Sequence, residues 1–201
     1  MSAGTILLIV GVCAIAYGIY VYNKLVSLKN RFRNAFSQID VQLQRRYELI
    51  PNLVEVAKGY MNHEHETLTE VTEARNDASG KAEKAAAAPD DASLVNALAG
   101  AEKQLSGALG RLNVVMEAYP DLKADVNMQD LHAEMTSTDN RVSFARQAYS
   151  DSVMRYNTYR EQIPANFIAA PFKFTEADLF EIDEEQAQIR EPIRVSFDKA
   201  A

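Results

Sequence analysis

The sequence predicts an all-α protein, in which an N-terminal transmembrane helix continues into a bundle of long antiparallel helices. Three observations predict this fold. An uncharged, mostly apolar run extends from Ser2 to Asn23. Beyond it, apolar residues recur every three or four positions, which is the spacing of one buried helix face. The composition agrees, because the 201 residues include no Trp, eight Gly and six Pro, too few turn formers for a β-protein of many short strands.

Residues 1–23 are predicted to form a transmembrane anchor. Their apolar centre, Ile6–Tyr22, has about 17 residues, which is near the lower limit for spanning about 30 Å of hydrocarbon. Three tyrosines, Tyr17, Tyr20 and Tyr22, supply an aromatic belt at one end of the run. The length and the belt together favour a single-pass span.

Two kinds of cleaved signal are the alternatives to an anchor. A signal peptide carries basic residues before its apolar run and a small-x-small cleavage site after it, whereas here the first basic residue is Lys24 and bulky tyrosines precede it. A lipoprotein signal ending at Cys13, the single cysteine, fits poorly because bulky Val12 stands before it. We therefore expect the anchor to be retained.

The charges after the anchor predict its orientation. Between Asn23 and Tyr60 there are seven Lys and Arg against three Asp and Glu, and four of the basic residues follow the span directly: Lys24, Lys29, Arg31 and Arg33. The rest of the chain holds 14 basic and 25 acidic residues. The positive-inside rule then places the N-terminus outside and the bulk of the chain in the cytoplasm. The basic stretch is explained either as a topology signal or as a contact with anionic headgroups.

Residues 24–164 are predicted to form the helical bundle. Its first helix is expected from Lys24 to about Ala87, because one apolar stripe keeps its phase over that range. Pro51 lies within it and predicts a kink, since proline lacks the N–H that a helix interior needs. We expect Arg46 to bond the carbonyl groups that the kink leaves free.

Two further helices are predicted after a hairpin tip within residues 79–93, where Pro89 and its neighbours supply a stop and capping oxygens. The second helix runs over residues 92–118. The third runs over residues 127–163, and its eleven positions in unbroken 3–4 alternation resemble a coiled coil. Residues 165–201 form a C-terminal segment with an acidic tail.

The predicted lengths leave part of the first helix without a partner. At about 1.5 Å per residue the first helix would extend about 95 Å and the second only about 40 Å, so the stripe next to the membrane stays uncovered. Either the C-terminal segment folds back over it or neighbouring copies cover it, and we expect the copies. Small residues line one face of the span and favour close helix packing. The predicted interface of a homo-oligomer is therefore Gly4, Gly11, Ala14, Gly18, Leu25, Leu28, Phe32 and Ile39.

No enzyme activity and no cofactor are predicted. The sequence has no phosphate-binding glycine loop, no Gly-x-Ser-x-Gly and no His-Glu-x-x-His. A metal site is disfavoured as well, because His63 and His65 point away from each other on a helix. His63 with Glu66 could reach a site only together with His132 from another helix. Exposed helix faces or interhelical hydrogen bonds are the simpler explanation for these residues.

Several blocks of sequence resemble the LemA family of bacterial proteins. The most specific is Arg46–Val54, which contains Pro51 and Asn52 and is followed by Lys58–Tyr60 and by His63 and Glu64. Further matches are Ala145, Arg146, Tyr149, Val153, Tyr156, Asn157, Pro164, Asn166, Ala169, Phe172, Phe174, Phe180, Glu181 and Pro192–Phe197. Ser150 and Lys173 depart from the pattern, which usually has asparagine and glycine there.

The resemblance implies a membrane-anchored helical bundle and no settled biochemical activity. Some relatives are linked to building membrane compartments. We therefore expect a structural or scaffolding protein that homo-oligomerises at the bacterial inner membrane and shapes or supports it. The alternative is an adaptor that presents its helical face or acidic tail to a partner such as a membrane protease or a quality-control protein. The expected partners are the lipid bilayer, further copies of the chain and a membrane protein, with no nucleic acid.

Overall fold

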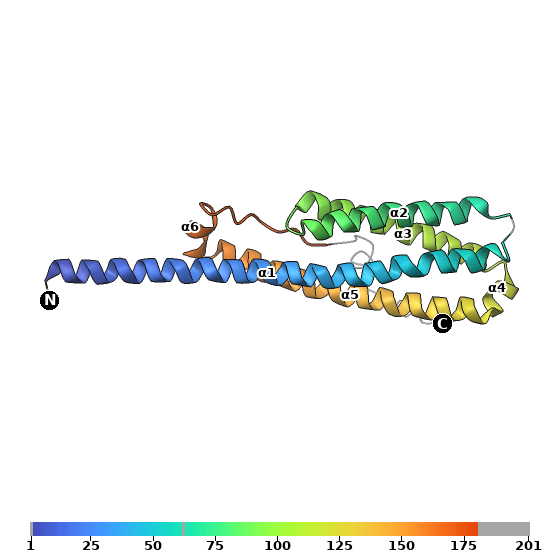
Figure 1. Ribbon diagram of the computed structural model, residues 1–201, viewed down its shortest axis with the longest axis horizontal. Coiled ribbons are helices and arrows are strands. Elements are labelled where there is room, and N and C mark those ends of the chain that lie inside the picture. The colour runs from blue at the N-terminus through green and yellow to red at the C-terminus, as the bar shows by residue number, and fades with distance from the viewer. Residues whose placement is uncertain (1, 62, 181–201) are drawn as a thin grey trace, which may run out of the picture.

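The computed structural model describes residues 2–61 and 63–180, and these form a helical rod without strands (Figure 1). Residues 181–201, which hold most of the predicted acidic tail, lie outside the described residues. The all-α fold with a long N-terminal helix is confirmed. The elements are α1 (Ala3–Lys58), α2 (His65–Ala87), α3 (Ala92–Met116), α4 (Pro120–Ala124), α5 (Val126–Glu161) and α6 (Ala165–Ala169).

The first helix ends much earlier than predicted. α1 stops at Lys58, and α2 starts at His65 and runs back along α1, so the single helix expected up to Ala87 is wrong. Gly59 follows a basic last turn, and the amides of Tyr60 and Met61 both donate to the carbonyl of Ala57. Met61 is buried although it lies in the turn, which explains why the apolar spacing shows no interruption there.

Four long helices lie side by side as an antiparallel bundle (Figure 1). The hairpin tip expected within residues 79–93 is confirmed at residues 88–91, where Asp91 caps the start of α3. α5 begins at the distal end, capped by Asp125, and its 36 residues reach back about 54 Å along α1. The bundle therefore extends from the distal turn almost to the anchor.

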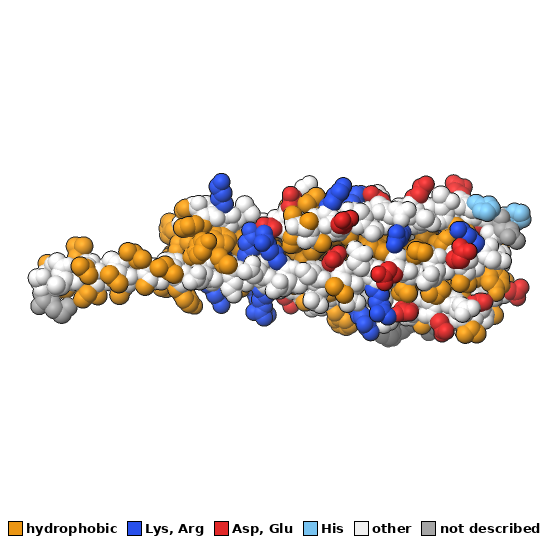
Figure 2. Space-filling view, in the orientation of Figure 1, with side chains coloured by type: hydrophobic (Ala, Val, Ile, Leu, Met, Phe, Trp, Pro, Cys, Tyr) orange, Lys and Arg blue, Asp and Glu red, His pale blue; other side chains and the backbone are white. Residues whose placement is uncertain are grey.

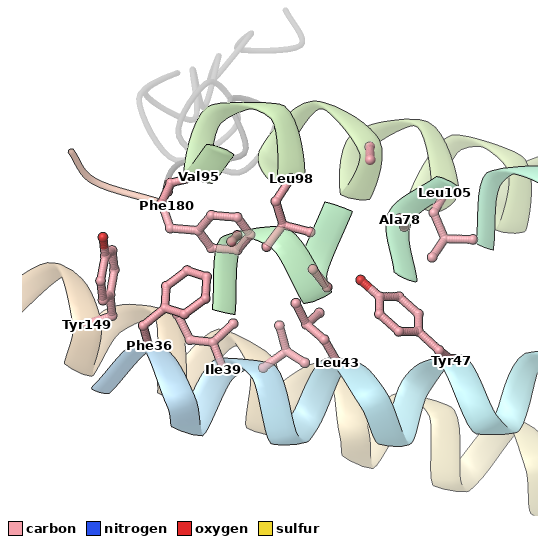
Figure 3. Packing of buried hydrophobic residues seen from close by; sticks show 14 of the residues in the cluster. Phe36, Ile39, Leu43, Tyr47, Ala78, Val95, Leu98, Leu105, Tyr149 and Phe180 are labelled. Atoms are coloured by element: carbon pink, nitrogen blue, oxygen red, sulfur yellow. The ribbon is translucent and has the colours of Figure 1, made fainter. Parts of the chain in front are cut away.

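The core is one continuous cluster of apolar side chains between these helices (Figure 3). Aromatic residues fill it near the anchor: the ring of Phe36 lies 5.5 Å from that of Tyr149 and 6.5 Å from that of Phe180. On α5, six of the eleven positions in the predicted 3–4 alternation are buried: Met128, Met135, Thr138, Val142, Tyr149 and Tyr156. This face of the third predicted helix therefore packs into the interior of the chain.

A buried ion pair crosses the middle of the bundle. The guanidinium of Arg46 on α1 donates to the carboxylate of Glu102 on α3 over 2.6 Å, and the two residues are 7% and 1% exposed. Its Nε lies 3.0 Å from Oδ1 of Asp139 on α5. The hydroxyl of Tyr47 donates to the other oxygen of Glu102. Burial, followed by the charge of Glu102, raises the pKa of Tyr47, so this hydroxyl stays a donor.

Pro51 lies inside α1, which continues through it to Lys58. Proline at this position leaves the carbonyl of Tyr47, four residues earlier, without its helical donor. The expectation that Arg46 bonds the freed carbonyl is wrong, because Arg46 turns to Glu102 and Asp139 instead. Arg75 of α2 supplies the donor, with its Nε 3.0 Å from the carbonyl oxygen of Tyr47. The kink itself stays a prediction.

The Tyr47 carbonyl should couple Pro51 energetically to Arg75. Arg75→Ala leaves this oxygen without a donor and should destabilise the fold by about 1–3 kcal/mol. In a Pro51→Ala background the restored backbone N–H can donate to the same oxygen, so Arg75→Ala should cost about 1 kcal/mol less. A double-mutant cycle from denaturant unfolding measures the coupling. Additive effects of the two substitutions would contradict this assignment.

Glu102 should be the most sensitive charged position in the bundle. Glu102→Ala leaves the buried Arg46 with only the half-exposed Asp139 as an ionic partner, and breaking a buried pair in this way typically costs about 3–5 kcal/mol. Arg45→Ala is the matched control. Arg45 directly precedes Arg46 in the chain, but it pairs with Glu134 at an exposed site. Its loss should cost about 1 kcal/mol or less. Equal shifts in the unfolding midpoints of the two variants would show that the buried pair carries no special weight.

Candidate functional site

The N-terminal part of α1 projects beyond the bundle as a bare apolar helix (Figures 1 and 2). Among the described residues, α1 alone is long and apolar enough to cross a membrane, by length and composition. Its large side chains from Ile6 to Ile19 are exposed on every face. A helix that is apolar all round belongs in an apolar surrounding, and the bundle provides none here. The membrane end of the rod is therefore the candidate site.

The stripe beside the anchor is covered by the chain itself, which corrects the predicted interface. Leu25, Phe32 and Ile39 are fully buried and Leu28 is partly buried. The ring of Phe32 lies 5.1 Å from that of Tyr156 and 6.4 Å from that of Tyr149, both on α5. Because α1 ends at Lys58, α5 starts nearer to the membrane than expected and reaches this stripe. These four residues therefore give no reason for a second copy.

The chain after α5 returns to the anchor. Phe172 and Phe174 pack edge-on against Tyr22, with ring centroids 5.0 and 5.6 Å apart. Ile168 of α6 lies 4.0 Å from the place where a Cβ at Gly18 would stand. Lys173 has a φ of 56°, in the left-handed region that favours glycine, and it is the position where the resemblance expects glycine. This turn directs the chain from α6 back along the bundle.

Residues 174–180 then run along the bundle as an extended strap. Phe174, Ala177 and Phe180 are buried, and the strap's backbone is bonded by side chains of α5. Asn157 both donates to the carbonyl of Ala177 at 2.8 Å and accepts from its amide at 3.1 Å. Tyr149 donates to the carbonyl of Asp178, and Tyr156 to that of Thr175. Tyr149, Tyr156 and Asn157, which are among the residues that match the LemA pattern, thus hold the strap.

Tyr60 behaves differently from the other two tyrosines of the family resemblance. The matched motifs predict that all three are core aromatics with satisfied hydroxyls, and Tyr149 and Tyr156 are. Tyr60 is instead 39% exposed at the distal turn and donates to Asp125 at 2.9 Å. Spacing along a helix could not place it, because the helix has already ended.

The basic residues after the anchor divide into two pairs. Lys29 and Arg33 both bind the carboxylate of Asp90 at the hairpin tip, at 2.9 and 2.7 Å. Burial on its own raises the pKa of Asp90, but the two hydrogen bonds and the two positive charges outweigh it and lower the pKa below 3.8. Lys24 and Arg31 are exposed. Lys29 and Arg33 therefore attach the hairpin tip to α1, whereas Lys24 and Arg31 face outward.

The small residues of the span lie on an open surface. A Cβ added at Gly11 would meet no atom within 4 Å, and one added at Gly4 would meet only the hydroxyl of Ser2, at 3.9 Å. Ala14 is exposed, while Gly18 is half-buried against α6. The stripe is thus accessible at Gly4, Gly11 and Ala14, and its fourth position is already occupied by this chain.

The histidines lie at the end of the rod opposite the anchor (Figure 2). His63 is exposed in the turn before α2, and His65 is the first residue of that helix. His132 is half-buried on α5. Within residues 2–61 and 63–180, no group of three or more His, Cys, Asp or Glu side chains is placed to hold a metal ion.

Comparison with known proteins gives relatives over most of the chain. A magnetosome protein, MamQ 1 of Paramagnetospirillum magneticum, is 25% identical over 175 residues, covering 80% of this chain and 64% of the relative. MamQ of Magnetospirillum gryphiswaldense is 23% identical, covering 79% and 64%. Protein LemA of Metamycoplasma hominis is 26% identical, covering 85% and 74%. The chain thus spans slightly less than two thirds of the length of the magnetosome relatives.

These similarities and the apolar helix support a membrane-associated protein. The family model described as LemA family matches residues 35–197, which include the buried Arg46 centre, the motif around Pro51 and the α5 residues that hold the strap. This match covers most of the sequence. The chain belongs to the LemA family.

Proposed function

We propose that this protein is a membrane-anchored scaffold that homo-oligomerises at the bacterial inner membrane and shapes or supports it. The observation that carries the proposal is the continuity of α1, which is one helix of 56 residues from the exposed apolar span into the core of the bundle. Because no linker separates the two parts, the tilt of the span sets the direction of the rod. A force or a crowding effect on the rods is therefore transmitted to the bilayer.

The accessible small-residue face of the span supports the oligomeric part of this proposal. With the stripe from Leu25 to Ile39 covered within the chain, the span becomes the surface where copies meet. Gly4, Gly11 and Ala14 offer a face along which a second helix can approach closely. Lipid tails are as apolar as leucine side chains, so close packing, and not exclusion of water, is what favours contact there.

An adaptor remains the alternative, and one observation favours it. The covered stripe removes one of the two reasons for a second copy, because the bundle is complete within one chain. In that case the rod would present its distal end or its acidic tail to a membrane protease or a quality-control protein. The scaffold proposal and the adaptor alternative both assign the chain no catalysis, no cofactor and no nucleic-acid partner.

Two neighbouring alanines on opposite faces of the span test the oligomer. Ala14 and Ala16 are both exposed, and two positions along a helix place their side chains about 160° apart. Ala14→Leu should obstruct close approach and shift the full-length protein toward monomer in mild detergent. Ala16→Leu adds the same volume on the other face and should leave the size unchanged. Light scattering coupled to size exclusion gives the mass of each variant.

If the unsubstituted protein is a monomer in that measurement, the homo-oligomer proposal is wrong and the adaptor alternative is favoured. Equal dissociation by both substitutions would instead mean that association does not depend on the small-residue face.

We also propose that the bulk of the chain is cytoplasmic. Lys24 and Arg31 follow the span and are exposed, as residues that resist translocation should be. A reporter fused after Ala201 should be active if it requires the cytoplasm and silent if it requires the periplasm. The reverse pattern would place the rod on the outer side of the membrane.

A further inference from the structure

Residues 163–174, here called the apolar lobe, expose several large apolar side chains next to the anchor. Ile163 is 78% exposed, Phe167 70% and Phe172 60%. The lobe contains no Asp, Glu or Arg, and Lys173 is its one charged residue. Figure 2 shows this apolar surface over α6, joined to the apolar surface of the span. A patch of this kind indicates an interaction surface.

We propose that the apolar lobe is a second membrane contact, which dips into the boundary between headgroups and acyl chains beside the span. It rests on the proposed anchoring through α1 and adds to it. The rod would then be attached to the membrane at two places, by the span and by the lobe beside it.

The position of the lobe along the span supports a lipid partner. Its contacts with α1 include Gly18 and Tyr22, within the uncharged run that ends at Asn23. Residues 3–22 are just long enough, at about 30 Å, to cross the hydrocarbon. If the bilayer ended before Gly18, residues 3–17 would provide only about 22 Å, roughly 8 Å too short. Whatever packs on Gly18 and Tyr22 is therefore at the level of the bilayer.

The depth of the lobe fits an interfacial position. Gly18 lies six residues before Lys24, the first charged side chain, which is about 9 Å along the helix. Amphipathic segments that lie in the interface bury their apolar faces about 5–10 Å deep. Lys173 on the lobe can extend its amine toward the headgroups while its aliphatic part stays with the apolar residues. Lys24, which is exposed, follows within one turn of Tyr22 and can reach the headgroups.

The backbone of the lobe is also prepared for a place with little water. An unbonded amide is costly there, and irregular chain is tolerated only when its polar groups are satisfied. Pro164 and Pro171 have no amide to satisfy. Six further amides of the lobe donate to carbonyls between Gln162 and Ala170, over 3.0–3.4 Å: those of Asn166, Phe167, Ala170, Phe172, Lys173 and Phe174.

A second protein is a weaker candidate for covering the lobe. The apolar surface of the lobe is continuous with that of the span, so a protein partner there would have to lie in the bilayer interface itself. Nothing acidic lies on the lobe to orient a soluble partner, and its exposed groups are flexible aliphatic and aromatic chains that lipid can surround from all sides. Lipid covers both surfaces with one occupant.

The absence of Trp from the sequence makes a direct test available. Four full-length variants with a single Trp are reconstituted into vesicles of phosphatidylethanolamine and phosphatidylglycerol, with or without brominated acyl chains. Phe167→Trp reports on the lobe. Phe144→Trp is the matched control, since Phe144 is 73% exposed on α5, away from the anchor. Ile9→Trp reports on the span.

The expected result is a graded pattern. Phe167→Trp should lose at least half of its emission to bromines near the headgroup and less to bromines near the chain end. Ile9→Trp should be quenched by the deep bromines, and Phe144→Trp by neither. Phe172→Trp should repeat the pattern of Phe167→Trp, which guards against a local disturbance by one substitution.

The failures are distinguishable. If Ile9→Trp is quenched while Phe167→Trp stays as unquenched as Phe144→Trp, the lobe proposal is overturned and the anchor stands. A blue-shifted but unquenched Phe167→Trp would mean that protein covers the lobe, which overturns it as well. If Ile9→Trp is not quenched by any bromine, the anchoring through α1 fails and the lobe proposal fails with it.

Discussion

One turn of α1 makes polar contacts with each of the other long helices of the bundle. Arg46 ties α1 to α3 through Glu102 and to α5 through Asp139, while the carbonyl of Tyr47 accepts from Arg75 of α2. Every other long helix is therefore bound to two consecutive residues of α1. Apolar packing supplies most of the stabilisation, but stripes of Leu, Ala and Val can slide by a turn at little cost. A buried ion pair cannot, because a shift by one turn leaves a charge without its partner. We infer that this centre fixes the register of the four helices.

The register of the bundle then determines what meets at the membrane end. With α1 and α5 fixed against each other, Tyr149 and Tyr156 face Phe32, and the strap finds its donors in place. The hairpin of α2 and α3 is fixed at its middle by Arg75 and Glu102 and at its tip by Asp90. Two kinds of contact are thus used. A buried ionic centre aligns the helices, and partly exposed charges attach the tip of the α2–α3 hairpin to α1. The second kind is weaker and more sensitive to salt.

The sequence was sufficient for the fold class, the long apolar N-terminal helix and the bounds of α3 and α5, because these depend on local spacing. It was misleading at Lys58–Met61, where a buried Met61 keeps the apolar spacing while the chain reverses. The Gly59 after a basic turn was the available signal for the end of the helix. That single error made the first helix too long, moved the start of α5 away from the membrane and left Leu25 to Ile39 falsely uncovered. Glu102 was also missed, although it falls four residues after Leu98 on a buried face, where a charge needs a partner from another helix. Arg75 could not be found, since its acceptor is a carbonyl exposed by a proline in a different helix.

Under the proposed scaffold function, the same geometry would let this small protein act on a bilayer. A single tilted helix is free to rotate and to change its tilt, because lipid resists these motions weakly. With the lobe in the interface as proposed, a rod that shares its helix with the span would have two points of contact with the membrane, and two points define a direction. The strap adds to this, because Asn157 and the two tyrosines bind the lobe's outgoing chain to α5, and Arg46 binds α5 to α1. Bending the rod relative to the membrane would then require lipid to leave the lobe or the strap to leave α5. A set of such rods, aligned through their spans, would resist changes in the angle between neighbours, and resistance of that kind is what is needed to support or shape a membrane.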